Sequence, residues 1–512
     1  MNGLDLNDSG RSPRAGTDVF RVVRSDPAAR QKDLTAAGII FLYCLLFAVL
    51  RLAVSSSMEL DESEQFLNGS FFSLGYAHQP PLYSWMVHSM SLLLGMNLQT
   101  LIITKYVILF FFYLSFYRIA RFFWDSRGSL LITGSLLFFP TYSYEFNRDL
   151  SHSVLVTAMA SITCYLFIRL LQRKRTIDYL LFGTSIGLGL LSKYNFAFFL
   201  SALILAAASF NEGRRMLSDK KVVLSLAGCL LIISPHVVWL IQSNFLPFRH
   251  ALTKAEAGTL SLSAAGKALS VIVSSYSGVA IFLVIFAVFF GSRISRGAQK
   301  SQAPLRLFRN LAVYGLTVTL LVIVVLRTGH FSERWLAPLL FSIPLTAFSK
   351  INLESDKTRV NVLGYLCIFI AVSILLVRSA IGFFPDAAGK VERIHTPFKD
   401  ISLQLRKELG KRDIDNLQDL TIITESEFLA ANMMYHLPDA KIFLSDGDPR
   451  RATGIIRTKA KVILWDAGKQ GDNIPDEFIF EFPSALPLRT LTAPYLHSTK
   501  FPPYVLGVAL IQ

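Results

Sequence analysis

The sequence predicts an α-helical protein that crosses a membrane many times and carries a small α/β domain at its C-terminal end. Of the 512 residues, 52% are hydrophobic and only 17% are charged. Apolar stretches recur from about residue 37 to residue 384, each long enough to cross the roughly 30 Å hydrocarbon core of a bilayer. From about residue 385 the composition becomes that of a soluble domain. We therefore expect a polar tail at 1–35, a transmembrane domain at 36–384 and an α/β domain at 385–512.

The apolar stretches predict about 11 transmembrane helices. The expected spans are residues 37–56, 100–122, 128–143, 150–170, 178–192, 194–210, 222–242, 268–290, 309–327, 334–349 and 361–384. The first span has no small-residue cleavage site after it, which indicates an uncleaved anchor rather than a signal peptide.

Charge sets the expected orientation. The net charge of +15 could suggest nucleic acid, but Lys and Arg concentrate in alternate loops, as in a membrane protein. The N-terminal tail and the loops on its side hold 25 Lys and Arg, against 7 in the opposite loops. We expect the N-terminus in the cytoplasm, the C-terminal domain outside and no nucleic-acid partner.

This assignment of alternate loops to the two sides requires that residues 80–98, PPLYSWMVHSMSLLLGMNL, do not cross the membrane. The segment is short, begins with Pro-Pro and contains His88 and several Ser, which favours a re-entrant or interfacial helix.

Beyond residue 385 the sequence alternates between helix-like and strand-like segments. FKDISLQLRKELGKR is amphipathic, SEFLAANMMYHL is helix-like, and LTIIT, KIFL and KVILW resemble short buried strands. The four Cys all fall inside apolar runs, so they neither form a disulfide framework nor a metal cluster.

Ionisable residues gather on the predicted outer face. In LDESEQFLN, Asp61, Gln65 and Asn68 share one side of a helix, and a stripe of Leu60, Leu67, Phe71 and Leu74 could lie in the membrane interface. The simpler interpretation is a solvated acidic loop.

A second carboxylate, Asp149, lies at the head of the helix that follows the next outer loop, beside Glu145 and Arg148. Lys193 in LLSKYN and Arg334 in GHFSERWLAP reach the same face. Ionisable groups at membrane depth are usually functional. Each also has a structural interpretation: a charge at a helix N-terminus for Asp149, a snorkelling side chain for Lys193 and an interface anchor for Arg334.

These stretches, in this order, resemble the integral-membrane family-C (GT-C) glycosyltransferases. Within them the chain is most similar to the protein-mannosyltransferase-like bacterial branch, which includes the aminoarabinose transferase and the Rgt-type galacturonosyltransferases of lipid A and core oligosaccharide. The resemblance covers about residues 37–384. The motifs are LDESEQF (60–66), GYAHQPPLYSW (75–85), NRDLSHS (147–153), GLGLLSKYNF (187–196), SPHVVWL (234–240) and GHFSERWLAP (329–338).

The resemblance implies transfer of a sugar from a polyprenyl-phosphate donor to a lipid A, core oligosaccharide or other envelope acceptor, at the periplasmic face of the bacterial inner membrane. Asp61 matches the family's catalytic acid and Asp149 its second carboxylate. The aminoarabinose branch has Glu-Lys before Pro-Pro, where this chain has His78-Gln79, so the cation for the lipid phosphate falls to Lys193, Arg148 or Arg334. Tyr194 and His330, from the same motifs, complete the expected substrate-binding set.

The residue types fit this chemistry. A carboxylate can deprotonate the acceptor hydroxyl as general base, and Lys or Arg can neutralise the leaving phosphate. One base without a second nucleophile predicts inversion at the sugar. No cofactor is expected; a divalent metal held by Asp61, Asp149 and His78 is an open alternative without a diagnostic ligand pattern. The competing functions are a transporter or flippase of a lipid-linked sugar and a structural or assembly subunit.

Overall fold

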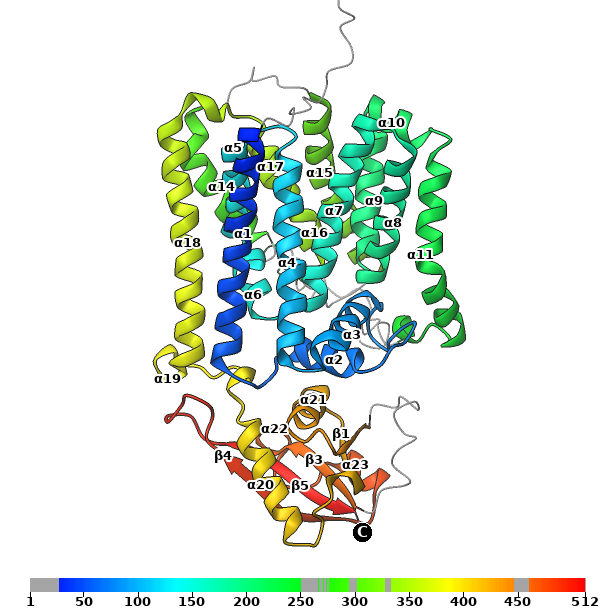
Figure 1. Ribbon diagram of the computed structural model, residues 1–512, viewed down its shortest axis with the longest axis vertical. Coiled ribbons are helices and arrows are strands. Elements are labelled where there is room, and N and C mark those ends of the chain that lie inside the picture. The colour runs from blue at the N-terminus through cyan, green and yellow to red at the C-terminus, as the bar shows by residue number, and fades with distance from the viewer. Residues whose placement is uncertain are drawn as a thin grey trace, which may run out of the picture.

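The computed structural model describes residues 27–249, 276–293, 302–326, 333–445 and 460–511, together with the isolated positions 266, 270 and 273. A bundle of long helices stands above a smaller domain built on a sheet (Figure 1). Two helices from the loop after the first span, α2 and α3, lie between the bundle and the sheet domain.

Several helices of the bundle have the length and apolarity of membrane spans. In the described residues, five qualify alone: α1 (Pro27–Val54), α4 (Leu98–Ala120), α7 (Ser151–Arg173), α11 (Val222–Gln242) and α18 (Lys357–Phe383). A sixth is the pair α9 (Phe196–Ala208) and α10 (Asn211–Leu217), bent by 115°. The rest of the bundle comprises α8 (Thr176–Ser192), α14 (Ser277–Phe290) and α15 (Gln302–Leu326), with the short helices α5 (Ser126–Gly134), α6 (Phe146–Arg148), α16 (Ala337–Leu340) and α17 (Ser342–Phe348).

Each of the predicted spans overlaps at least one of these helices, which confirms the helical membrane fold; the first part of the 268–290 span, up to residue 275, lies largely outside the described residues. Two spans are not single helices as the sequence suggested. The 128–143 span passes from α5 into a 3-10 turn, Ser135–Phe138, and a π-helical turn, Thr141–Glu145. Pro140 lies between these turns, and proline has no N–H to continue an α-helical hydrogen-bond ladder. The 334–349 span is likewise divided into α16 and α17, which contain Pro338 and Pro344.

The loop after the first span folds as α2 (Leu60–Gly69) and α3 (Leu82–Leu94). At 13 residues, α3 is too short to span, and it lies beside α2 at the end of the bundle (Figure 1), as expected for a helix that does not cross. Gly69 permits this packing, because a Cβ at this position would lie 2.5 Å from Val87 Cγ1 of α3. The prediction that Phe71 and Leu74 continue the apolar stripe of this helix was wrong, because α2 ends at Gly69 and both residues lie outside it.

The C-terminal domain contains a five-stranded mixed sheet in the order β2-β1-β3-β5-β4. Strand β1 pairs in parallel with β2 and β3, whereas β5 is antiparallel to β3 and β4. The strands are β1 (Leu420–Thr424), β2 (Lys441–Leu444), β3 (Ala460–Asp466), β4 (Ala485–Ala493) and β5 (Tyr504–Ile511); the helices are α19 (Pro385–Ala388), α20 (Phe398–Gly410), α21 (Glu427–His436), α22 (Ala467–Gln470) and α23 (Asp476–Glu481). The predicted strands β1, β2 and β3 and helices α20 and α21 are present; β4 and β5 were not predicted.

Helix α21 joins this domain to the membrane domain. Ala430 and Ala431 are buried in the core of the helix bundle, and the Tyr435 ring meets Phe66 of α2 edge-on at 5.9 Å. Fully buried Asn432 accepts a hydrogen bond from the Met58 N–H (2.9 Å) through its side-chain oxygen. The Asn432 side chain also donates to Ser63 Oγ at 3.5 Å. The start of α2 is thus fixed by a residue more than 350 positions later in the sequence.

Further contacts tie the two domains at the ends of α1 and α18. Ser57 Oγ donates to the Thr396 carbonyl (2.6 Å), and His497 Nε2 lies 2.9 Å from the Val54 carbonyl. Asp386, just after α18, accepts hydrogen bonds from the Ser498 hydroxyl and the Thr499 N–H.

We predict that Asn432→Leu loosens the start of α2. The Met58 N–H would lose its partner, at a cost of about 1–3 kcal/mol for an unsatisfied buried polar group. Hydrogen–deuterium exchange of the purified protein should be faster in peptides covering residues 55–66. Asn473→Leu, at an exposed position of the same domain, should leave exchange there unchanged. Equal exchange in wild type and Asn432→Leu would contradict this role.

Candidate active site

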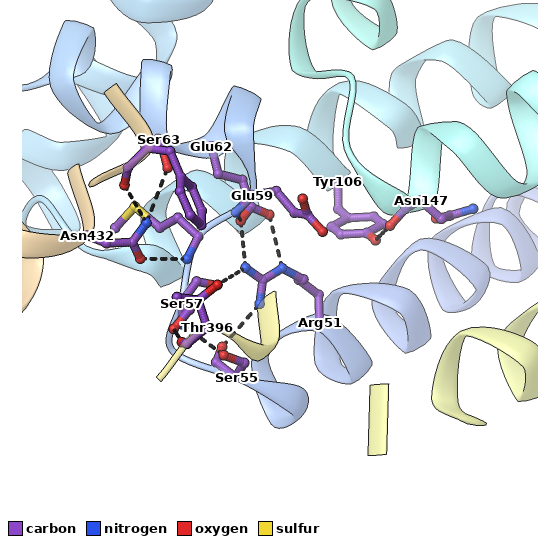
Figure 2. A network of polar contacts seen from close by, with 12 residues as sticks. Arg51, Ser55, Ser57, Glu59, Glu62, Ser63, Tyr106, Asn147, Thr396 and Asn432 are labelled. Atoms are coloured by element: carbon purple, nitrogen blue, oxygen red, sulfur yellow. Dashed lines mark hydrogen bonds and ion pairs between the residues drawn. The ribbon is translucent and has the colours of Figure 1, made fainter. Parts of the chain in front are cut away.

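A buried ion pair holds α2 against α1. The Arg51 guanidinium donates to both carboxylate oxygens of Glu62, at 3.1 and 2.6 Å, and also to the carbonyls of Ser55 and Ser57 (Figure 2). Arg51 and Glu62 are 5% and 3% exposed. Burial alone would raise the pKa of Glu62, but the Arg51 charge outweighs burial and lowers it. Removing one partner of such a pair leaves an uncompensated buried charge, which costs about 3–5 kcal/mol.

The first turn of α2 is also capped. Glu59 is the N-cap residue and forms a capping box with Glu62, whose carboxylate accepts the Glu59 N–H at 2.8 Å. Burial, with the nearby Glu62 charge, raises the pKa of Glu59 to about 7. Asp61 lies between these two acids in the sequence and is half-buried. Ion pair and cap together fix the backbone that carries Asp61.

Gln65 is occupied by structural contacts rather than facing an open site with Asp61. Its side-chain amide donates to His152 Nε2 of α7 at 2.8 Å and accepts the Ser84 hydroxyl of α3 at 2.9 Å. These bonds connect α2 to both neighbouring helices.

Asp149 lies where the helical path is broken. It follows the π-turn and α6, and Leu150, the N-cap of α7, has a φ of +69°, a left-handed conformation that is uncommon for a residue with a side chain. The Asp149 side chain is buried, and in the described part of the chain its Oδ1 has no hydrogen-bond partner. Burial, reinforced by the Asp61 and Glu59 charges, raises the pKa of Asp149 well above its usual value. Asp149 is therefore not a helix N-cap, and it is available to a ligand.

The structure brings Asp61 and Asp149 together with a lysine that sequence reasoning missed. Lys105 of α4 is only 2% exposed, and the charges of Glu62, Asp149 and Asp61 act on it most strongly. A lysine inside an apolar span is costly and usually functional, which was the available signal. Lys105 supplies the positive charge that this group of buried carboxylates needs.

Lys193 and Arg334 form a second positive feature beside Asp61. Lys193 follows α8, is half-buried and donates to Ser153 Oγ at 3.0 Å. Burial lowers the pKa of Lys193, Asp61 opposes this shift, and the positive charge of Arg334 adds to it. Arg334 lies in a 3-10 turn, Glu333–Trp335, and is exposed. Because the Arg334 charge acts on Lys193, the two cations could neutralise an anionic ligand near them.

The remaining predicted site residues are spread more widely. Arg148 forms an ion pair with Glu145 at 2.9 Å. The Tyr194 hydroxyl is 3.2 Å from His236 Nε2 of α11, and its ring packs on Phe248, so it belongs to the α11 side of the site. His78 and Gln79 are half-buried in the segment between α2 and α3. His330 lies outside the described residues.

Within the described residues, no group of three or more His, Cys, Asp or Glu side chains is arranged to hold a metal ion. The chemistry proposed below uses the chain's own side chains.

The sequence is similar to two characterised relatives and to one family. Residues 78–239 match the family described as dolichyl-phosphate-mannose-protein mannosyltransferase. The lipopolysaccharide core galacturonosyltransferase RgtB of Rhizobium johnstonii is 30% identical over 79% of this chain and 81% of its own length. RgtA of the same organism, also a lipopolysaccharide core galacturonosyltransferase, is 26% identical over 93% of this chain and 97% of its own length.

The fold is also that of solved structures. ArnT from Cupriavidus metallidurans matches in its apo state with a TM-score of 0.62, and bound to undecaprenyl phosphate with a TM-score of 0.59. Both matches cover 93% of this chain, and 98% and 97% of ArnT, at 11% sequence identity. At this identity, the match shows the fold alone.

The helical bundle, the carboxylates at the end that faces the C-terminal domain, and the 30% identity to RgtB over most of both chains all lead to the same family. The chain is a multi-pass membrane protein and belongs to the GT-C glycosyltransferases as a relative of the Rgt galacturonosyltransferases, and it shares its fold with ArnT.

Proposed function

We propose that the protein transfers a glycosyl unit, of the galacturonate class, from a polyprenyl phosphate to a hydroxyl of the lipopolysaccharide core. The donor and acceptor are inferred from the names of the relatives, RgtB and RgtA, and from the undecaprenyl phosphate bound to ArnT. Lipid A and other envelope glycans are the alternative acceptors.

The observation that carries this proposal is the juxtaposition of carboxylates and cations at one end of the bundle. Asp61 is near enough to Asp149 and to Lys193 for its charge to act on both, and Arg334 acts on Lys193. A transferase of this kind needs a base for the hydroxyl and cations for the phosphate within the length of one sugar.

In the proposed reaction Asp61 accepts the proton of the acceptor hydroxyl as its oxygen bonds to the anomeric carbon. The bond from that carbon to the phosphate oxygen breaks, and its electron pair stays on the phosphate. Lys193 and Arg334 neutralise the developing phosphate charge. Asp149 positions the acceptor hydroxyl, and Lys105 keeps the two aspartates close despite their repulsion. A single displacement of this kind inverts the sugar.

The proposed location is the bacterial inner membrane, with α2, α3 and the C-terminal domain in the periplasm. The support is the excess of Lys and Arg at the opposite end of the bundle. A polyprenyl-phosphate sugar would then reach Asp61 from the outer leaflet.

We predict that Asp61→Asn lowers turnover by roughly 100-fold or more, the range expected for loss of a general base. The amide keeps the size and the helical position but cannot accept the proton. Transfer from polyprenyl-phosphate galacturonate to lipopolysaccharide should be measured with purified variants, with binding of polyprenyl phosphate followed separately and remaining unchanged. Asp476→Asn, in exposed α23, is the matched control. Near wild-type transfer by Asp61→Asn would rule out Asp61 as the base.

Lys193→Ala and Arg334→Ala should weaken donor binding instead. Each removes a charge-assisted contact to phosphate, and we expect the Kd for polyprenyl phosphate to rise about tenfold or more. Calorimetry in detergent can measure this, with Lys220→Ala, exposed between α10 and α11, as control. An unchanged Kd in both variants would place the phosphate elsewhere.

Cysteine labelling can test the orientation. Ser70→Cys and Gln418→Cys, both exposed, should react with an impermeant maleimide in intact spheroplasts, whereas Ser218→Cys should react only after lysis. The four native cysteines are buried and give little background. The opposite labelling pattern would invert the topology.

A further inference from the structure

A cleft of about 420 Å³ lies between the membrane domain and the C-terminal domain. From the membrane domain it is lined by Asp149, Arg148 and Glu59. From the other side come residues of the C-terminal sheet and its helices, including Phe428, Asp466 and Tyr495. The cleft therefore connects the buried carboxylate with the unpartnered Oδ1 to a surface that sequence reasoning had left without a function.

The sheet topology places this cleft where open α/β sheets bind ligands. Strand β1 leads through α21 to β2 on one side, while its other parallel neighbour is β3. Crevices outside the carboxyl ends of such strands, where the strand order reverses, are ligand sites. Asp466 is the last residue of β3, and Phe428 lies in the first turn of α21, the helix that follows β1. Both cleft residues therefore lie at the carboxyl ends of the parallel strands β3 and β1.

The lining has the chemistry of a saccharide site. Tyr495 and Tyr504 lie with ring centroids 6.1 Å apart, giving aromatic surface beside carboxylates and cations. A sugar ring can pack an apolar face on such rings while its hydroxyls bond to the charged groups.

The charges favour an anionic group on that saccharide. Several ionic groups at the cleft already have partners: Glu392 pairs with Arg378 (2.9 Å), and Asp466 with Lys469 (2.7 Å). Within the described residues, Glu59 and Asp149 line the cleft without an ion pair, and burial raises the pKa of both carboxyl groups. Arg393 lines the cleft, is exposed and makes no ion pair within the part of the chain that the structure describes. A guanidinium is suited to bind a carboxylate or phosphate through two parallel hydrogen bonds.

We propose that this cleft is the acceptor site: it binds an anionic saccharide, with Arg393 on the carboxylate or phosphate, Tyr495 against a sugar ring and the reacting hydroxyl at Asp149. The proposal rests on the proposed function for the identity of the reaction. It assigns to the C-terminal domain the selection of the acceptor.

The test uses the full-length protein in nanodiscs, polyprenyl-phosphate galacturonate as donor and lipopolysaccharide from a strain lacking the gene as acceptor. Arg393→Glu and Tyr495→Ala should each raise the KM for lipopolysaccharide about tenfold or more, as expected for loss of a charge-assisted bond or a buried contact. The Kd for polyprenyl phosphate should stay unchanged. Arg393→Lys should restore part of the affinity. Arg406→Glu, an exposed charge reversal on α20, is the control and should have no effect.

Direct binding of lipopolysaccharide without donor separates this proposal from the proposed function. If wild type does not transfer galacturonate, the proposed donor is wrong, yet weaker lipopolysaccharide binding by Arg393→Glu still supports the cleft. If both cleft variants bind and use lipopolysaccharide within twofold of wild type, the cleft is not the acceptor site.

Two modified acceptors identify the anion. Dephosphorylated and carboxyl-reduced lipopolysaccharide are compared, and the treatment that removes the difference between wild type and Arg393→Glu shows which group Arg393 binds. If neither treatment removes the difference, recognition of an anion by Arg393 is wrong.

Discussion

The arrangement of the bundle end that faces the C-terminal domain depends on the ion pair between Arg51 and Glu62. Its bidentate geometry fixes the last turn of α1 relative to the first turn of α2, and the remaining guanidinium donors bind the carbonyls of the connecting residues. Because both side chains are buried, moving either one would leave the charge of the other unpaired in an apolar environment. Asp61 is held on this rigid corner, so its carboxylate can approach Asp149 although the two repel each other.

Placing several carboxylates together at the edge of a membrane requires compensation. Lys105 provides it from α4, Lys193 from the end of α8, and Arg51 from the end of α1. The opposed charges come from helices that are far apart in the sequence, so the site exists only when the bundle is assembled. This coupling makes the same residues responsible for folding and for the electrostatics of the site.

Much of the membrane domain could be predicted from local sequence. Span length and the short Pro-Pro segment before α3 are local signals, and the helices follow them. Asp61, Asp149, Lys193 and Arg334 could be selected because each is ionisable at a predicted membrane boundary.

Lys105 was missed because one lysine does not disrupt an 18-residue hydropathy window. The interruption of the helix before Asp149 was also missed. Pro140 is a local signal for it, but the π-helical turn that follows depends on tertiary contacts as well. Strand β4 was missed because it lies at the sheet edge and mixes exposed and buried residues without a clear apolar pattern. Strand β5 was missed although it is apolar and mostly buried.

The contact between α21 and α2 has an evolutionary consequence. Asn432 on the C-terminal domain satisfies the Met58 backbone next to Asp61, and Thr396 and His497 bind carbonyls in the same outer segment. The sheet domain is thus not an independent module attached to a membrane enzyme. Exchange of this domain between relatives would therefore remove hydrogen-bond partners of the α2 corner, unless the residues that bind each other across the contact were exchanged together.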